Sequence, residues 1–193
     1  SIEEQVVGTS LMPAGLAEIL TRDELVDLVR FLSALGKPGP FAIGRQPKAR
    51  RWRVLADTQT ARFRLRRTRD GQAATDDDAF TWIPRYSTVA GHLPLGDLPL
   101  LMVRDRKLSV VRCEIEVIAG GSVAIAVGDT AGLKAWIGTE PLALQPVTSR
   151  TLPKGRHRLT LVVDRSVRSG PLSLAIDEAA SAKTANARFV TGK

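Results

Sequence analysis

A methionine on a proline-stiffened loop is the side chain in this sequence best placed to hold a metal. Met12 lies in the run Ser10–Leu16, between a leucine and Pro13, directly ahead of an amphipathic helical pattern. Its thioether is a soft, neutral donor, and a stiff loop can hold such a group out to a metal. Methionine also fills gaps in protein cores. Met12 is therefore a candidate metal ligand, with a core residue as the alternative.

Aromatic side chains are the second set with a chemical use. Trp82, Tyr86, His92 and Trp136 could stack on sugar rings from exposed loops, although tryptophans in a small β-domain often belong to the core. His92 and His157 are 65 residues apart and have no cysteine or paired carboxylate beside them, so we do not expect a metal site there. The run Asp76–Asp78 is either a calcium ligand set or an acidic loop tip.

Signs of catalysis are few. The chain has no Gly-x-Ser-x-Gly motif and no phosphate-binding glycine loop, and its two histidines leave little choice of general base. We therefore expect this chain to be non-catalytic. No apolar run approaches the roughly 20 residues that span a bilayer, so no membrane segment is expected.

A short helix is predicted after the Met12 loop. Thr21 to Glu24 has the form of a capping box, and the apolar residues then recur at steps of three and four up to Leu35. Gly36 and Pro38 should stop the helix. About four turns of helix need something to cover their apolar stripe.

Charge and composition divide the chain near residue 37. Residues 1–36 carry two basic and six acidic groups, whereas residues 37–70 hold eleven Lys and Arg against two Asp. Prolines and glycines fill the stretch 37–47, which predicts a linker. We therefore expect three regions: a helical segment at 1–36, the linker at 37–47 and a second domain at 48–193.

Alternating apolar residues predict that the second domain is mainly β, a β-sandwich of seven or eight short strands. The expected strands are 52–55, 61–65, 111–117, 123–127, 133–137, 159–163, 172–176 and 189–190. Gly120-Gly121 should form a tight hairpin turn, and 75–96 should be a long irregular loop. On the strand at 61–65, Arg62, Arg64 and Arg66 would share the solvent face. They would bind an acidic partner or simply face water; nucleic acid is unlikely as the partner, because no nucleic-acid-binding motif accompanies them.

The stretch from Ser10 to Leu32 resembles the last third of a class I cytochrome c domain. More narrowly, it is similar to the cytochrome segment of large, multidomain dehydrogenase-like proteins of planctomycete-type bacteria. The resemblance implies that Met12 is the axial ligand of a haem c iron, a ligand that suits electron transfer. It also implies a periplasmic or extracellular location and other domains of the parent chain as partners.

Covalent haem attachment needs a Cys-x-x-Cys-His motif, and the only cysteine here is Cys113. The chain alone therefore cannot be a cytochrome c. Because it starts inside the resembled domain, we expect it to be a C-terminal piece of a longer, haem-containing redox protein. No cofactor is expected in the piece by itself.

The segments 127–138 and 152–161 resemble the central part of PA14-like and galactose-binding-like sandwich modules, whose sandwich is of jelly-roll type. The resemblance implies a carbohydrate- or partner-binding role, with Asp129 and Trp136 as ligand-binding residues. Trp82 and Tyr86, named above for their aromatic type, complete the set of candidate ligand-binding residues. In those modules paired aspartates hold calcium or sugar hydroxyls; here Asp129 is followed by Thr130. The alternative is a stand-alone structural, adhesion or carbohydrate-binding sandwich with no haem role.

Overall fold

A computed structural model describes residues 20–34, 37, 46–67, 70–75, 78–182 and 185–191. The chain divides into two compact units, Ser1–Ile43 and Gly44–Lys193. The division falls inside the stretch 37–47 that the sequence marks as a linker. Each unit is described by itself below.

The first unit contains helix α1, Arg22–Ala34. Its N-terminus is the predicted capping box: the Glu24 N–H donates to Thr21 Oγ1 at 3.3 Å, and the Glu24 carboxylate accepts from the Thr21 N–H at 2.8 Å. The Thr21 N–H and the Thr21 hydroxyl both donate to the Glu24 carboxylate and lower the pKa of that carboxyl. Within Arg22–Ala34 no residue is buried, so Leu25, Leu28, Val29 and Leu32 lie open on the surface of the helix. Met12 and the predicted stop at Gly36 lie outside the described residues.

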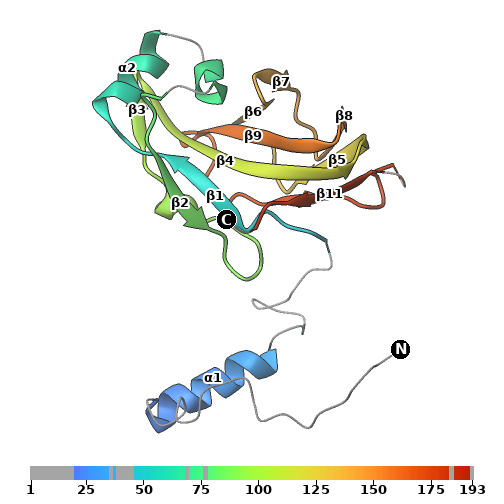
Figure 1. Cartoon of the computed structure of the whole chain (residues 1–193). Helices are drawn as coiled ribbons and strands as arrows, with labels where there is room; N and C mark the ends of the chain where they lie inside the picture. Colours follow the sequence, from blue (N-terminus) through green and yellow to red (C-terminus); the bar gives the residue numbers. More distant parts are fainter. Residues whose placement is uncertain are drawn as a thin grey trace. The chain divides into compact units, whose positions relative to one another are not determined.

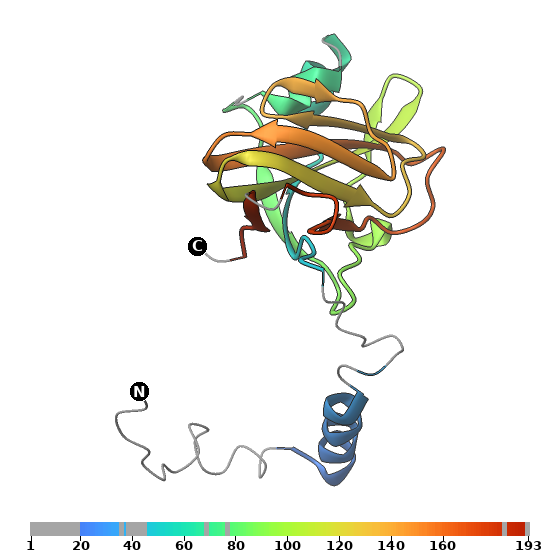
Figure 2. The same cartoon turned by 90° about the vertical axis from the view of Figure 1, so that its right-hand side faces the viewer.

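The second unit is mainly β, as predicted, with two antiparallel sheets that form a β-sandwich-like fold (Figures 1 and 2). The large sheet has the order β2-β1-β4-β9-β6-β7, with β3 and β11 also paired to β4, and the small sheet has the order β10-β5-β8. The strands are β1 Arg51–Leu55, β2 Trp82–Tyr86, β3 Leu101–Val103, β4 Arg106–Ala119, β5 Gly121–Val127, β6 Leu133–Ile137, β7 Glu140–Leu142, β8 Val147–Leu152, β9 Gly155–Asp164, β10 Leu174–Ile176 and β11 Asn186–Phe189. Three helical turns accompany them: α2 Gln59–Arg67, η2 Asp70–Ala74 and η3 Leu95–Asp97.

The large sheet has a core on each face. On β4, alternate residues from Val111 to Val117 face the small sheet and pack with its buried side chains, including Val123 and Ile125. Cys113 belongs to this inner core, where burial raises the pKa of its thiol. The other face carries an outer core in which Leu65 of α2 and Ala73 of η2 cover the sheet.

The segment 61–65 is a helix, and the predicted strand is wrong. Ala61 and Leu65 are buried while Phe63 is 52% exposed, which is the spacing of one helical face rather than of a strand. The Ala61 N–H donates to Thr58 Oγ1 at 3.1 Å, so a threonine caps this helix too. Consequently Arg62, Arg64 and Arg66 project from a helix and do not share the face of a strand.

Two other local predictions are also corrected. Gly120 links β4 to β5, but these strands lie in different sheets, so Gly120-Gly121 is a crossing between the layers and not a hairpin turn. At Gly121 a Cβ would lie 2.9 Å from the Cβ of Ala185, so only glycine fits this crossing without a shift of its neighbour. The stretch 75–96 is not wholly irregular, because it contains β2, which pairs with β1 along its whole length.

Candidate functional site

One end of β9 is left open by its neighbour in the large sheet. β6 ends at Ile137, opposite Leu159, whereas β9 extends back to Gly155. At Gly138, whose φ of 58° is in the left-handed region, the chain turns away into β7, and the Gly138 N–H donates to the Arg158 carbonyl at 2.8 Å. The turn therefore leaves a space beside residues 155–158.

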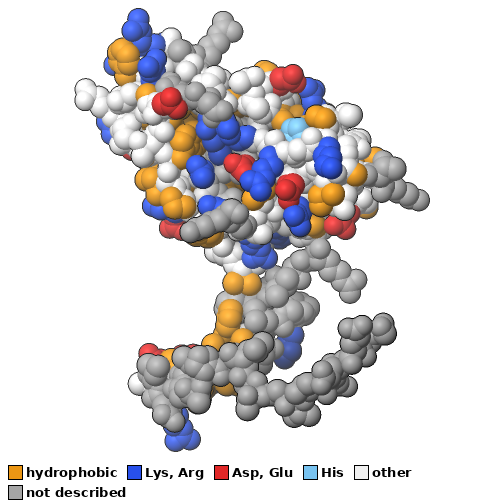
Figure 3. Space-filling model, in the orientation of Figure 1, with side chains coloured by type: hydrophobic (Ala, Val, Ile, Leu, Met, Phe, Trp, Pro, Cys, Tyr) orange, Lys and Arg blue, Asp and Glu red, His pale blue; other side chains and the backbone are white. Residues whose placement is uncertain are grey.

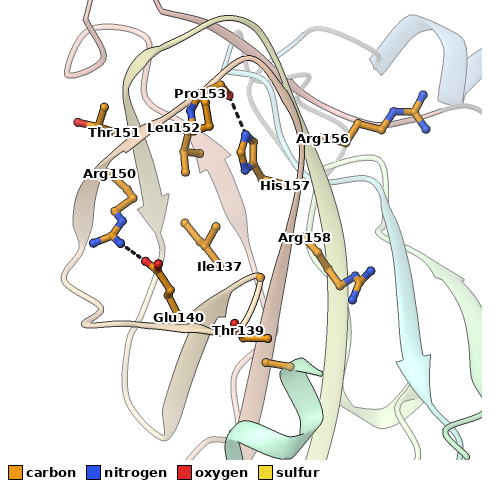
Figure 4. A pocket seen from close by; sticks show the side chains of 12 residues that line it. Ile137, Thr139, Glu140, Arg150, Thr151, Leu152, Pro153, Arg156, His157 and Arg158 are labelled. Carbon is orange, nitrogen blue, oxygen red and sulfur yellow. Dashed lines mark hydrogen bonds and ion pairs between the residues drawn. The ribbon is translucent and has the colours of Figure 1, made fainter. Parts of the chain in front are cut away.

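This space is a groove of about 580 Å³ between the β6–β7 hairpin and the connection from β8 to β9 (Figure 4). Its walls come from both sheets, because β7 belongs to the large sheet and β8 to the small one. The lining residues are Ala74, Ile137, Gly138, Thr139, Glu140, Arg150, Thr151, Leu152, Pro153, Arg156, His157 and Arg158.

The groove has basic and apolar parts. The partly exposed Ile137 supplies apolar surface near Arg150, Glu140 and His157, while Arg156 and Arg158 extend to the other side of β9 (Figure 4). This division follows from the alternation of side chains along a strand. The lining thus holds three arginines and a histidine but one carboxylate, that of Glu140, a composition that favours an anionic ligand.

The groups at the rim of the groove already have partners. Arg150 of β8 forms an ion pair with Glu140 of β7, so this bridge joins the two sheets. The His157 Nε2 lies 2.7 Å from the Pro153 carbonyl oxygen. Arg156 lies 3.8 Å from a Glu116 carboxylate oxygen. A ligand with carboxylate or sulfate groups could replace Glu140 as the partner of Arg150.

The tryptophans named from the sequence lie in the outer core. Trp136 is only 8% exposed and packs there with residues such as Val162. Trp82 is half-buried on β2, and its ring meets that of Phe80 edge-on at 6.4 Å. Tyr86, at the end of the same strand, is 66% exposed.

Asp129 is held in a loop by a buried arginine. Arg168, which is 4% exposed, lies 3.3 Å from an Asp129 carboxylate oxygen and donates to the Asp129 and Pro171 carbonyls at 2.7 and 2.8 Å. The other Asp129 carboxylate oxygen accepts from the Ala131 N–H. The Asp129 carboxylate is thus paired with the Arg168 guanidinium of the same chain.

The structure does not bring the four named residues together. Trp82 and Tyr86 lie on β2, and three strands (β1, β4 and β9) separate them from Trp136 on β6. The groove is instead formed by residues that the sequence reasoning missed as a group, Arg150, Glu140 and Ile137 among them. The basic run Lys154–Arg158 was the signal available in the sequence.

Within the described part of the chain, no group of three or more His, Cys, Asp or Glu residues could hold a metal ion. Cys113, the chain's single cysteine, is buried in the inner core of the sandwich and does not suit thioether attachment of haem. These residues therefore do not fit a haem c, and we derive no chemistry through one. None of the described helices has the length and apolar character needed to cross a membrane.

Comparisons with known proteins found no match. No protein-family model, no curated protein and no solved structure matches this chain.

Proposed function

We propose that the sandwich is a non-catalytic binding module whose groove takes an anionic carbohydrate. The observation that carries the proposal is the composition of the groove: Arg150, Arg156, Arg158 and His157 against the single carboxylate of Glu140. Guanidinium groups bind carboxylates and sulfates through paired, charge-assisted hydrogen bonds. The partly exposed side chain of Ile137 would pack against the C–H face of a sugar ring.

The shape of the groove supports a chain-like ligand. It runs past the open end of β9 and is bounded by the β6–β7 hairpin of the large sheet and by β8 of the small sheet. At its rim Arg150 pairs with Glu140, and His157 lies 2.7 Å from the Pro153 carbonyl oxygen, which suits exchange of one partner for another rather than proton transfer. We therefore assign binding, and not catalysis, to the groove.

The resemblance at Ser10–Leu32 supports a wider proposal. In it, the module belongs to the C-terminal region of a periplasmic or extracellular, multidomain haem redox protein of planctomycete type, with Met12 as axial ligand. The capping box at Thr21 and Glu24 agrees with the helix that the resemblance implies. A visible absorption spectrum of the native parent polypeptide tests this: a haem spectrum that changes with Met12→Ala supports it, and a spectrum without haem opposes it.

The groove is tested by calorimetric titration of the full chain with two oligosaccharides of equal length. One is an oligogalacturonate, which carries a carboxylate on each sugar, and the other is a neutral glucan. We expect only the acidic oligomer to bind, and we expect its affinity to fall when salt is raised above about 0.1 M. Amide chemical-shift changes confined to β7, β8 and the start of β9 would place it in the groove.

The opposing results are equally specific. Binding of the neutral glucan as tightly as the acidic oligomer would refute charge recognition. Shift changes centred on Trp82 and Tyr86, with none near Arg150, would move the site to β2. An absence of binding by either oligomer, with binding of an acidic peptide of matched charge, would make the groove a protein-docking site.

A further inference from the structure

A second basic surface lies at the other end of the large sheet's outer face, on α2. It consists of Arg62, Phe63, Arg64, Arg66 and Arg67 with Arg104 from the β3–β4 turn, and we name it the α2 corner. In the view of Figure 3, Lys and Arg side chains lie beside hydrophobic ones at the place where Figure 1 labels α2. Apart from Ala74 of η2, the groove residues come from the segment between Ile137 and Arg158, so the two surfaces share no residue.

An aromatic ring lies among these charges. Phe63 is 52% exposed, although the inward side of the same helix is occupied by the buried Ala61 and Leu65. The Arg67 guanidinium lies 5.3 Å from the centre of the Phe63 ring, a cation–π contact that holds both groups at the surface. An exposed aromatic side chain in a basic setting is an arrangement suited to the boundary between lipid headgroups and acyl chains.

The arginines work against the stability of the helix. Arg62 and Arg66 are four residues apart, and Arg64 and Arg67 are three apart, so like charges are neighbours on its surface. Asp57 forms an ion pair with Arg62. Arg104, held by a 2.9 Å bond to the Arg66 carbonyl, adds a further positive charge. An anionic partner would favour such an accumulation of positive charge on one helix face.

The corner is held rigidly in place. Leu65 packs into the outer core, and the next turn, η2, is fixed by the buried Asp70, which bonds Arg106 of β4 at 2.7 Å and Lys134 of β6 at 2.7 Å. The exposed side of α2 is therefore presented as a preformed surface. It is a convex helix face, which matches an extended surface better than a small ligand.

We propose that the α2 corner binds the surface of an anionic phospholipid membrane. The arginines would lie among the phosphate groups, and Phe63 would enter the boundary below them. Each basic residue near such a surface contributes on the order of 1 kcal/mol, so the arginines together suffice for reversible attachment.

Co-sedimentation of the full chain with vesicles tests this proposal. One set of vesicles is phosphatidylcholine alone, and the other contains phosphatidylglycerol in addition. We expect binding only to the anionic vesicles. The double variant Arg64→Gln/Arg67→Gln should lower the partition coefficient about 30-fold, and Phe63→Ala should lower it several-fold. Arg53→Gln, which removes an exposed arginine of β1, is the matched control and should leave binding unchanged.

The variants act at exposed positions, and far-ultraviolet circular dichroism checks that each one is folded. Equal binding to neutral and anionic vesicles, or anionic binding that the double variant does not change, would overturn the proposal. So would a DNA duplex that binds more tightly than the vesicles and loses that binding in the same double variant, because the corner would then be a nucleic-acid surface.

Discussion

The guanidinium of Arg112 lies 3.8 Å from the centre of the Trp82 ring, across the outer face of the large sheet. Its Nη2 also donates to the carbonyls of Ala73 and Thr75, each at 2.6 Å. Arg112 is only 7% exposed, so these bonds form away from water. A single side chain of β4 thereby joins β2 to the η2 turn that covers the sheet.

Replacing the Trp82 ring tests this contact. Trp82→Leu removes the aromatic face beneath a desolvated cation, and we expect unfolding free energy to fall by about 2 kcal/mol. Trp82→Phe keeps an aromatic face and should lose about half as much. The measurement is the urea midpoint at an unchanged slope. Equal losses in the two variants would show that only the packing of the side chain matters.

Asp70 should make the protein sensitive to acid. The hydrogen bond from Arg106, joined by Lys134, lowers the pKa of the Asp70 carboxyl to about 2 from an ordinary 3.8, against the opposing effect of burial. The folded state therefore holds this proton less tightly than the unfolded state does. The resulting stability is present above pH about 4 and is lost as pH falls toward 2. Because Arg106 and Lys134 are partly exposed, we expect about 1–2 kcal/mol.

Two variants separate this effect from general acid denaturation. Asp70→Asn should be less stable at neutral pH, and its stability should depend less on pH between about 4 and 2. Asp57→Asn is the comparison, because Asp57, the partner of Arg62, is more exposed than Asp70. It should change the free energy of unfolding by less than about 0.5 kcal/mol. An unchanged acid slope in Asp70→Asn would assign the acid sensitivity to other carboxylates. Urea unfolding across this pH range supplies the data.

The ion pair in the groove predicts opposite effects from its two members. Arg150→Gln should weaken oligogalacturonate binding about 10-fold, because it removes a charged donor from the groove. Glu140→Gln should tighten binding several-fold, because the ligand no longer competes with a carboxylate of the protein. Titration calorimetry at constant salt measures both.

The control is again Arg53→Gln on β1, which removes the same charge away from the groove. It should change affinity by less than about two-fold, through the long-range field alone. If Arg53→Gln weakens binding as much as Arg150→Gln, the acidic oligomer is held by net charge and not by the groove.

Two glycines with similar backbone angles should respond differently to alanine. Gly132 and Gly138 have φ values of 66° and 58°. A Cβ at Gly132 would lie 3.0 Å from the Asp164 carbonyl oxygen, whereas a Cβ at Gly138 would meet nothing within 4 Å. Gly138→Ala should therefore cost about 1 kcal/mol for backbone strain alone, and Gly132→Ala about 2 kcal/mol or more. Thermal unfolding compares them; equal losses would mean that the crowding at Gly132 relaxes freely.

Features that depend on local spacing could be predicted from the sequence. The capping box at Thr21 and Glu24 and the alternation along residues 111–117 each specify one element, and both predictions are confirmed. The strand predicted at 61–65 is wrong because its pattern fits both structures. Apolar residues at 61, 63 and 65 have the spacing of a strand, but 61 and 65 are also four residues apart, the spacing of one helical face. Burial of Ala61 and Leu65 on the outer core selects the helix.

The groove could not be predicted, because its parts meet only through pairing of distant strands. Arg150 and Glu140 lie on edge strands of different sheets, and which strands form those edges depends on the sheet order. Aromatic type alone does not tell whether a side chain is exposed: Tyr86 is 66% exposed and Trp136 only 8%. Side chains alternate between the two faces of β6, and the side chain of Trp136 lies on the face that packs into the outer core.

The large sheet cannot be completed until β11 is available to pair with β4. One edge of β4 pairs with β9, and the other pairs in turn with β3, β1 and β11, so its last partner is Phe189 opposite Ile115. When β4 leaves the ribosome, about half of the unit Gly44–Lys193 is still to be translated, so the apolar residues of β4 do not yet have all their partners. Such a high contact order places folding on the slow timescale of all-β domains. Until β11 arrives, the nascent chain exposes an unpaired strand edge, the feature through which partly folded β-proteins associate.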